Sequence, residues 1–214
     1  MKHITFYLDF ISPYAYLAFE ELPQALMGLS YSVTYKPLLF AALLKHHGQL
    51  GPAEIPAKRD WTYRQVLWRA HSQGLPLDLP AVHPFNPLGL LRLAVATQAQ
   101  GLPNRYVCEN LMRHVWVGGA DAADAERLQA LTKQLAPSRD PSDVSVKAQL
   151  KAHADEAIAK NVFGVPSFEV DGKVFWGHDA LPMLRRYLEG DAWFADTAWE
   201  RVQTHPAGIP LHRT

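Results

Sequence analysis

The residue best placed to do chemistry follows an apolar stretch at the start of the chain. Apolar side chains alternate with period two over residues 3–10, which predicts a buried strand. Ser12 and Pro13 come next, and a hydroxyl followed by proline is typical of a helix start. A strand that runs into a helix N-terminus places this hydroxyl at the edge of the sheet, in a partly positive field that suits an anion or a thiolate. The spacing alone favours a Ser12 that only caps the helix.

Other reactive residue types point to few activities. Cys108 is the only cysteine, so it can form no intramolecular disulfide or CxxC pair, and its apolar helical neighbours indicate an inert buried thiol. Ten histidines occur without HExxH or HxH spacing, and we expect no metal site. The chain also lacks GxSxG, GxxxxGK[ST] and GxGxxG, the motifs of nucleophile elbows, phosphate loops and dinucleotide sites. Disulfide exchange is excluded by the cysteine count.

The elements that position Ser12 are read from periodicity and from turn residues. We expect helices over 13–28, 38–44, 61–74, 86–100, 104–116, 124–135, 141–160 and 180–189, and strands over 31–36, 166–170 and 173–176. A further short helix is expected within 191–202, and the tail after it is expected to be irregular. This order predicts an α/β fold, a thioredoxin-like βαβ…ββα sheet domain (1–37 and 163–214) with an all-helical insertion domain (38–162).

Composition narrows the class of protein. The 214 residues are 48% hydrophobic and 20% charged, which is enough for a sizeable core. Lys and Arg (21) balance Asp and Glu (21), so nucleic acid and anionic membranes are not expected as partners. The first residues do not resemble a signal peptide, and no apolar run is long enough for a membrane span. We therefore expect a soluble cytoplasmic protein.

Three segments together carry a family resemblance: 10–17 (FISPYAYL), 163–168 (FGVPSF) and 175–179 (FWGHD). In this order and spacing they resemble the 2-hydroxychromene-2-carboxylate isomerases, which are related to the kappa-class glutathione transferases and, more distantly, to the periplasmic disulfide oxidoreductases. The resemblance covers nearly the whole chain, including the segments 48–52 and 83–87 in the insertion. It implies reduced glutathione as cofactor.

The resemblance assigns roles around the glutathione thiol. It implies that Ser12 hydrogen-bonds the sulfur and favours the thiolate, the effect that also lowers cysteine pKa values at helix N-termini. It implies a cis Val165–Pro166 bond, with the Val165 main chain holding the cysteinyl part. Asp179 would meet the γ-glutamyl amine. The alternatives are a trans proline that opens an edge strand and an Asp179 that only caps a helix.

The insertion would close the other side of the cleft. Gln49 and Lys58 fall where kappa transferases hold the glutathione carboxylates, and Arg59 could replace Lys58. An aromatic carboxylate substrate needs a cation and apolar walls, which Lys58 or Arg59 could supply together with Trp61 and Phe85. An ordinary exposed lysine is the alternative for Lys58.

The Asp171–Gly172 pair between the strands 166–170 and 173–176 predicts a two-residue hairpin turn. Residues near the end of this hairpin would shape the same pocket. The resemblance places Trp176, Gly177 and His178 beside the cofactor, although Trp176 could equally pack in the core. Many relatives have a small or amide residue where this chain has His178, and an arginine where it has Ala180. The missing arginine puts the anion-binding side of the pocket in question.

The resemblance implies a glutathione-dependent cis–trans isomerase in aromatic catabolism, acting on a carboxylate of the 2-hydroxychromene-2-carboxylate type through transient thiolate addition. A kappa-like glutathione transferase or peroxidase is the second hypothesis, and a non-catalytic ligand-binding scaffold is the third. The expected partner is a small aromatic molecule, and relatives suggest a homodimer.

Overall fold

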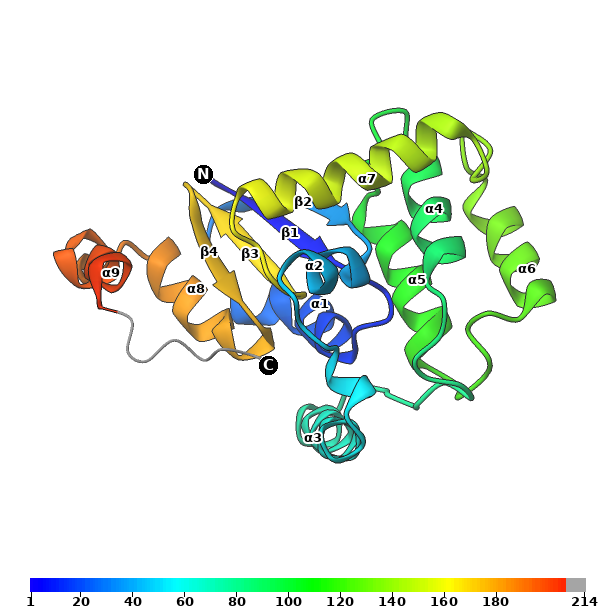
Figure 1. Ribbon diagram of the computed structural model, residues 1–214, viewed down its shortest axis with the longest axis horizontal. Coiled ribbons are helices and arrows are strands. Elements are labelled where there is room, and N and C mark those ends of the chain that lie inside the picture. Colours follow the sequence, from blue (N-terminus) through cyan, green and yellow to red (C-terminus); the bar gives the residue numbers. More distant parts are fainter. Residues whose placement is uncertain (207–214) are drawn as a thin grey trace.

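The computed structural model describes residues 1–206, apart from the side chains of Thr197 and Gln203, so the predicted tail and the end of the predicted sheet domain lie partly outside the described residues. Its centre is a four-stranded sheet in the order β2-β1-β3-β4 (Figure 1). The strands are β1 (Lys2–Leu8), β2 (Tyr31–Pro37), β3 (Ser167–Val170) and β4 (Lys173–Trp176). β1 pairs with β2 in parallel and with β3 antiparallel, and β3 pairs with β4 antiparallel. The predicted βαβ…ββα order and the α/β fold class are confirmed.

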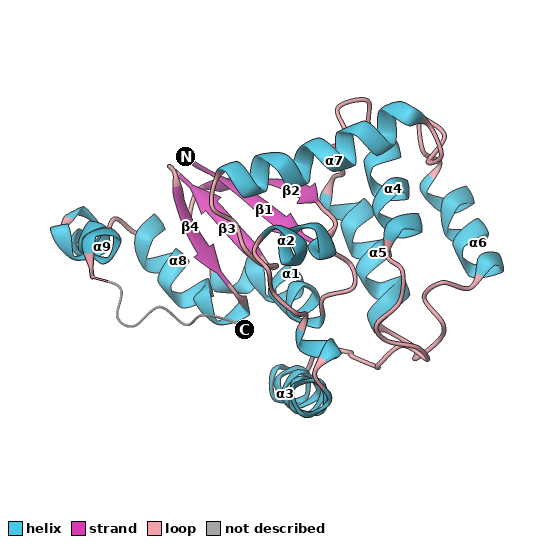
Figure 2. Ribbon diagram, in the orientation of Figure 1, coloured by secondary structure: helices cyan, strands magenta, loops and turns pink. Residues whose placement is uncertain are grey.

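Helices surround this sheet (Figure 2). They are α1 (Pro13–Ala25), α2 (Phe40–His46), α3 (Pro56–Gln73), α4 (Leu88–Ala96), α5 (Arg105–Trp116), α6 (Ala125–Leu135), α7 (Val144–Ala159), α8 (Leu181–Leu188) and α9 (Thr197–Arg201). Short 3-10 turns lie at Pro52–Glu54, His178–Ala180, Ala192–Ala195 and Val202–Thr204. Each predicted helix is present, but the prediction started α3 too late, because Pro56 occupies its first turn. α4 ends earlier than predicted, at Ala96.

The two faces of the sheet pack against different helices. Phe6, Phe168 and Phe175 belong to the larger core cluster together with side chains of α1, α4, α5 and α8. Tyr7 points to the opposite face, where it packs in a second cluster with residues of α2, α7 and the loop that contains Val165. Alternation along β1 therefore buries both faces of the strand, as the apolar sequence predicts.

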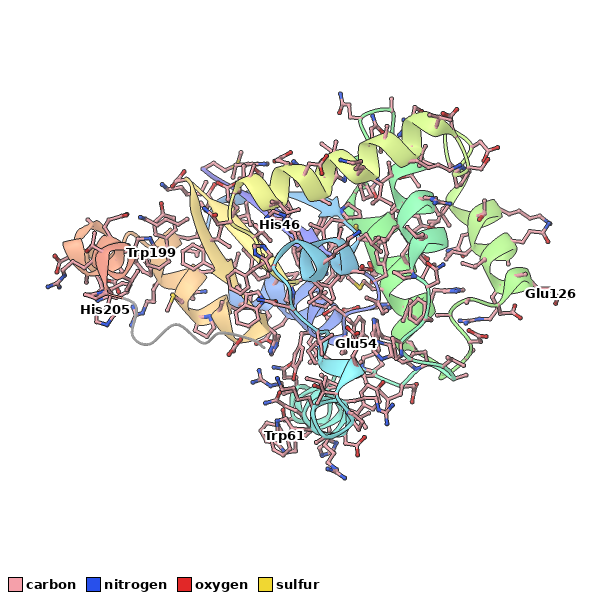
Figure 3. The ribbon with its side chains drawn as sticks, viewed as in Figure 1. His46, Glu54, Trp61, Glu126, Trp199 and His205 are labelled. Carbon is pink, nitrogen blue, oxygen red and sulfur yellow. The ribbon has the colours of Figure 1, made fainter. Side chains whose placement is uncertain are left out.

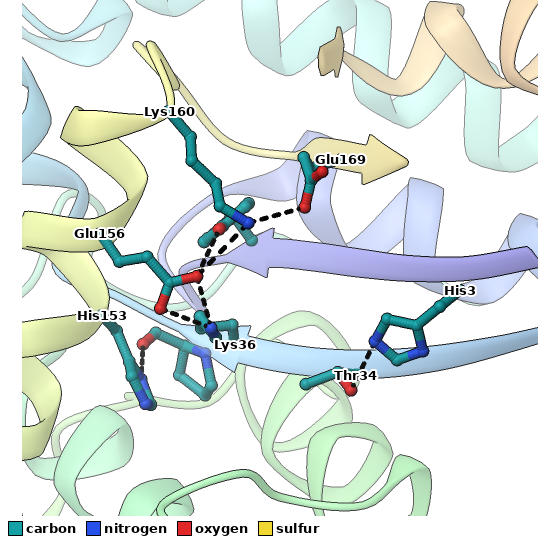
Figure 4. Close-up of polar contacts among 9 residues, drawn as sticks. His3, Thr34, Lys36, His153, Glu156, Lys160 and Glu169 are labelled. Carbon is teal, nitrogen blue, oxygen red and sulfur yellow. Dashed lines mark hydrogen bonds and ion pairs between the residues drawn. The ribbon is translucent and has the colours of Figure 1, made fainter. Parts of the chain in front are cut away.

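Charged side chains fasten α7 to this second face of the sheet (Figure 4). Lys36 of β2 pairs with Glu156 of α7 at 2.7 Å, and Lys160 pairs with Glu169 of β3 at 2.9 Å. His153 is buried and hydrogen-bonds the Pro37 carbonyl at 2.8 Å. Because α7 leads directly into the loop that holds Val165, these contacts help to set the position of that loop.

Helix α1 contains a proline near its C-terminal end. Pro23 has no N–H to donate to the carbonyl of Phe19, four residues earlier. Arg105, from the start of α5, donates to that carbonyl through both terminal nitrogens at 3.3 Å. Its guanidinium also lies 4.2 Å from the centre of the Phe19 ring. A residue of the predicted insertion thus completes a helix of the predicted sheet domain.

The division into two domains stays a prediction. One continuous hydrophobic cluster joins β1 and α1 to α4 and α5, so the helices between β2 and β3 share a core with the sheet. α3 lies at the edge of the molecule (Figure 1), and only Val66 and Ala70 of its side chains are buried. Among residues 1–206, no helix is both long and apolar enough to cross a bilayer.

Candidate functional site

Ser12 lies at the N-cap of α1, with its side chain buried. The backbone N–H of Ala15 donates to Ser12 Oγ at 3.2 Å, so the residue does cap the helix. The Ser12 hydroxyl proton points elsewhere, since Oγ donates to the carbonyl of Val165 at 3.5 Å. Capping uses the hydroxyl as an acceptor and leaves its proton for a long, weak bond. Capping α1 and donating a hydrogen bond to a thiolate are therefore compatible roles for Ser12.

The loop before β3 faces Ser12. The Val165–Pro166 peptide bond is cis, the isomer that the resemblance implies. Within residues 1–206, the backbone N–H of Val165 has no hydrogen-bond partner. The Pro166 carbonyl accepts from the N–H of Gly177 at 2.9 Å. The three motif segments, far apart in the sequence, thus meet through the Ser12 hydroxyl and through main-chain groups of the other two segments.

Two aromatic residues from the insertion hold the loop that leads into Ser12. Trp116, at the end of α5, donates its indole N–H to the Phe10 carbonyl at 2.9 Å. His83 Nε2 lies 2.8 Å from the Ile11 carbonyl oxygen. The rings of His83 and Trp116 are in contact, with centroids 5.4 Å apart. Neither role is predictable from the sequence, because nothing local to either residue indicates a contact with the first loop.

The hydrogen bonds of His83 determine its tautomer. A carbonyl can only accept, so Nε2 carries the proton that bonds to Ile11. Nδ1 is then a lone-pair acceptor, and the Tyr63 hydroxyl lies 2.8 Å from it. Burial lowers the pKa of His83, which favours this neutral form. Tyr63 of α3 and His83 together brace the Ile11 carbonyl.

Asp9 lies between β1 and Ser12 and is completely buried. One carboxylate oxygen accepts from the N–H of Phe40 at 2.8 Å, at the start of α2, and the other accepts from the N–H of Ile11 at 3.2 Å. Burial raises the pKa of Asp9 to about 7, although these backbone hydrogen bonds act in the opposite direction. Asp9 thus ties the α2 terminus to the Ser12 loop.

Asp179 lies in the 3-10 turn that follows β4, and its side chain is exposed. The alternative of a helix cap is wrong, since neither the turn nor α8 has a side-chain capping bond. A Cβ at Gly177 would lie 2.5 Å from Asp179 Oδ1, and Gly177 has φ 97°, so this position suits glycine. In the described part of the chain, the Asp179 carboxylate forms no hydrogen bond or ion pair.

His178 faces inward, which differs from the cofactor contact that the resemblance implies. Its side chain is 5% exposed. Nδ1 lies 2.7 Å from a terminal nitrogen of Arg69, and Nε2 contacts the carboxylate of Glu21. Both ring nitrogens are therefore engaged within the protein.

Trp176 is not a core residue, since it is 53% exposed and its ring packs on Phe163 at 4.8 Å. Its indole nitrogen lies against Gly164, beside Val165, where a Cβ on the glycine would come within 2.5 Å. Trp176 therefore borders the loop that faces Ser12.

The predicted site residues of the insertion are dispersed. Lys58 is exposed, and within residues 1–206 it has no ion pair, whereas Arg59 lies 3.7 Å from Asp60. Trp61 is 63% exposed on the outer side of α3 (Figure 3), and its role as a wall of the substrate pocket stays a prediction. Phe85 is half-buried, with its ring centroid 6.1 Å from that of His83.

Gln49 lies on the exposed loop after α2, where its backbone N–H bonds to the Leu44 carbonyl at 2.9 Å. No hydrogen bond in the described part joins its side chain to the residues around Ser12. The structure therefore does not bring the predicted carboxylate ligands of the insertion together.

A hollow beside the edge strand β2 is a weaker candidate. It is lined by residues that include Tyr31, Val33 and Arg105. The guanidinium of Arg105 is already bonded to the Phe19 carbonyl and the Tyr35 hydroxyl, so it offers a ligand little free charge. No group of three or more His, Cys, Asp or Glu residues within 1–206 is placed to hold a metal ion.

Known proteins resemble this chain over nearly its whole length. The family model of the DSBA-like thioredoxin domain matches residues 3–189. A 2-hydroxychromene-2-carboxylate isomerase of Sphingobium xenophagum is 27% identical over 87% of this chain and 98% of its own length. A kappa 2 glutathione S-transferase of Caenorhabditis elegans is 28% identical over 87% of this chain and 92% of its own.

The solved structure of a 2-hydroxychromene-2-carboxylate isomerase superposes with a TM-score of 0.74 at 22% identity, covering 92% of this chain and 99% of that one. At this identity the likeness shows the fold. Together with the family match over residues 3–189, it establishes that the chain belongs to the DSBA-like thioredoxin domain family.

Proposed function

We propose that this protein is an isomerase that uses reduced glutathione to convert an aromatic-ring-derived carboxylate, of the 2-hydroxychromene-2-carboxylate type, between its cis and trans forms. The observation that carries the proposal is the buried Ser12 hydroxyl at the N-terminus of α1, facing the Val165 carbonyl. Relatives named as 2-hydroxychromene-2-carboxylate isomerases support it, at 27–28% identity over most of the chain.

The groups around Ser12 fit glutathione in their chemistry. The Val165 N–H has no partner in the described part, and its carbonyl has only the long bond from Ser12. An extended peptide segment can pair with such a free N–H and carbonyl as an added strand. The Asp179 carboxylate, also without a partner there, suits an ammonium group. These are the groups that a cysteinyl residue with a γ-glutamyl amine requires.

Bound glutathione would supply a thiolate that adds to a conjugated carbon of the substrate and leaves again after rotation about the resulting single bond. Ser12 donates its hydroxyl proton toward the sulfur, in place of the long bond to Val165. The N-terminus of α1 adds a partly positive field at the same point. Both effects favour negative charge on sulfur, as they do for cysteine thiolates at helix ends.

A kappa-like glutathione transferase or peroxidase is the second candidate, because the C. elegans kappa 2 enzyme is as similar to this chain as the isomerases are. The two activities differ in what happens to glutathione, which a transferase consumes and an isomerase returns. A scaffold that binds a ligand without catalysis is the third candidate. A cytoplasmic location and a homodimer remain predictions.

The experiment combines calorimetric titration with reduced glutathione and an assay of 2-hydroxychromene-2-carboxylate isomerisation. Wild type and Ser142→Ala, which changes an exposed serine far along the chain, should bind glutathione and isomerise the substrate with no net loss of thiol. Asp179→Ala should bind glutathione more weakly. Stoichiometric thiol loss with a chlorinated aromatic, without isomerisation, would favour the transferase. No binding at millimolar glutathione would leave only the scaffold.

A further inference from the structure

Arg69 of α3 is held in one orientation by a buried histidine. Its Nη1 lies 2.7 Å from His178 Nδ1. Arginine is always a donor, so Nδ1 accepts and the proton of the neutral ring lies on Nε2, where it bonds to the Glu21 carboxylate. Within residues 1–206, the other N–H groups of Arg69 have no partner. A guanidinium fixed on one side with its remaining donors free is arranged to bind an anion.

Glu21 anchors this arrangement from α1. Its carboxylate also accepts from the side-chain amide of Gln73 at 2.9 Å. Gln73 and Arg69 are one turn apart on α3, so the hydrogen bonds that Glu21 and His178 make to them form a closed ring with that turn. The ring connects α1, α3 and the turn after β4. Arg69 is therefore placed before any ligand arrives, which reduces the entropy lost on binding.

Tyr14 shows that Arg69 borders the Ser12 site. Tyr14 is two residues after Ser12, and its hydroxyl bonds to Gln65, one turn before Arg69 on α3. Burial raises the pKa of Tyr14, while the positive charge of Arg69 lowers it and the negative charge of Asp179 raises it. Asp179 directly follows His178, the hydrogen-bond partner of Arg69, so the two charged residues are neighbours in the fold. They form no ion pair with each other among residues 1–206.

We propose that Arg69 binds the α-carboxylate at the γ-glutamyl end of glutathione, opposite Asp179, which binds the α-ammonium group. An amino acid zwitterion carries these two charges on one carbon. Asp179 directly follows His178, the hydrogen-bond partner of Arg69, so unpaired charges of opposite sign from neighbouring residues match them. The inference rests on the proposed function. It also explains why the site can lack an arginine at Ala180, because the cation comes from α3 instead of from the turn after β4. His178 then has the role of a positioning residue.

Two glutathione analogues separate these contacts. 4-Aminobutyryl-cysteinylglycine lacks the α-carboxylate, and glutaryl-cysteinylglycine lacks the α-amine. Dissociation constants are measured by calorimetry for each ligand with wild type and Arg69→Met. We expect Arg69→Met to weaken the binding of glutathione about tenfold or more, which is the effect of one hydrogen-bonded charge. The same variant should leave the binding of the carboxylate-free analogue unchanged. Asp179→Asn should weaken the binding of glutathione but not the binding of the amine-free analogue.

Three variants control the experiment. Arg64→Met changes an exposed arginine on the same helix and should bind all three ligands like wild type. Arg69→Lys keeps the charge and should show an intermediate loss of affinity for glutathione alone. This variant keeps the test valid if Arg69→Met unfolds. His178→Phe should weaken the binding of glutathione but not the binding of the carboxylate-free analogue.

The role of Arg69 would be overturned if Arg69→Met lost affinity equally for glutathione and for the carboxylate-free analogue. It would also be overturned if this variant lost affinity for neither ligand. In both cases the proposed function stands if wild type binds glutathione. If wild type does not bind glutathione, the proposed function fails first, and this inference fails with it.

Discussion

His83 Nε2 lies 2.8 Å from the carbonyl oxygen of Ile11, the residue before Ser12, although 72 residues separate the two in the chain. Trp116 makes the equivalent contact with Phe10, at 2.9 Å. Two consecutive carbonyls of the Ser12 loop thus accept hydrogen bonds from the helical insertion. These two contacts therefore help to determine where the Ser12 hydroxyl is held.

Ser12→Ala tests the central residue. Removing a hydroxyl that stabilises developing charge typically lowers the rate 10²–10³-fold, and we expect a loss of that order in isomerisation. The helix also loses its cap, so the free energy of unfolding should fall by about 1 kcal/mol. Steady-state kinetics and chemical denaturation of the same preparation measure both effects. Full activity in Ser12→Ala would refute its assignment.

His83→Leu and His83→Gln form a matched pair. Leucine leaves the carbonyl of half-buried Ile11 without a donor, which should cost about 1–3 kcal/mol of unfolding free energy and lower activity roughly tenfold by displacing the Ser12 loop. Glutamine keeps an N–H near the position of Nε2, so it should recover most of the activity. The pKa of the bound glutathione thiol, followed by thiolate absorbance, should rise in His83→Leu. Two variants with the same activity would show that the hydrogen bond is unimportant.

Asp9 should make stability depend on pH. Its pKa is raised in the folded protein to about 7, from an ordinary value near 4. Between these values the folded state binds more protons than the unfolded state, so this group's contribution to stability is present below pH 4 and is lost as the pH rises to about 7. The difference in unfolding free energy between wild type and Asp9→Asn should therefore fall over this range, by at most about 4 kcal/mol. A constant difference from pH 4 to pH 8 would contradict the prediction.

Three histidines, of which His153 is buried and His83 and His114 are half-buried, should act in the opposite direction. Burial lowers the pKa values of His83, His114 and His153 in the folded protein. The unfolded chain then binds more protons as the pH falls below about 6.5, so the stability that these neutral rings contribute is lost in acid. His153→Gln, which keeps a donor for the Pro37 carbonyl, should reduce the acid sensitivity measured by thermal unfolding from pH 7 to pH 5. An unchanged acid slope would exclude His153 as a contributor.

Arg105→Met tests the completion of α1. It would leave the Phe19 carbonyl, which Pro23 cannot satisfy, without a donor, at a cost of about 1–3 kcal/mol in unfolding free energy. Arg64→Met on exposed α3 is the control and should change stability by less than about 0.5 kcal/mol. The double variant Arg105→Met/Pro23→Ala should recover part of the loss, because alanine supplies the missing N–H. No recovery would mean that Arg105 stabilises the protein mainly through the Phe19 ring.

The sequence by itself determined the local parts of this protein. The alternating apolar residues of β1, the Ser12–Pro13 helix start and the Asp171–Gly172 hairpin turn depend on neighbouring residues, and all three are found as predicted. In the turn, both residues have positive φ, 50° and 79°, as a two-residue hairpin requires. The order of these elements was enough to predict the fold class.

Only the tertiary structure decided which side chains surround Ser12. His83, Trp116 and Arg69 come from separate helices and loops of the insertion, and no local spacing relates them to residues 10–14. Lys58 and Arg59, which the sequence favoured as cations, lie on the same helix as Arg69 but form no hydrogen bond or ion pair with the Ser12 loop in the described part of the chain. Periodicity reports which face of a helix is buried, whereas helix packing decides which of its residues reaches the site.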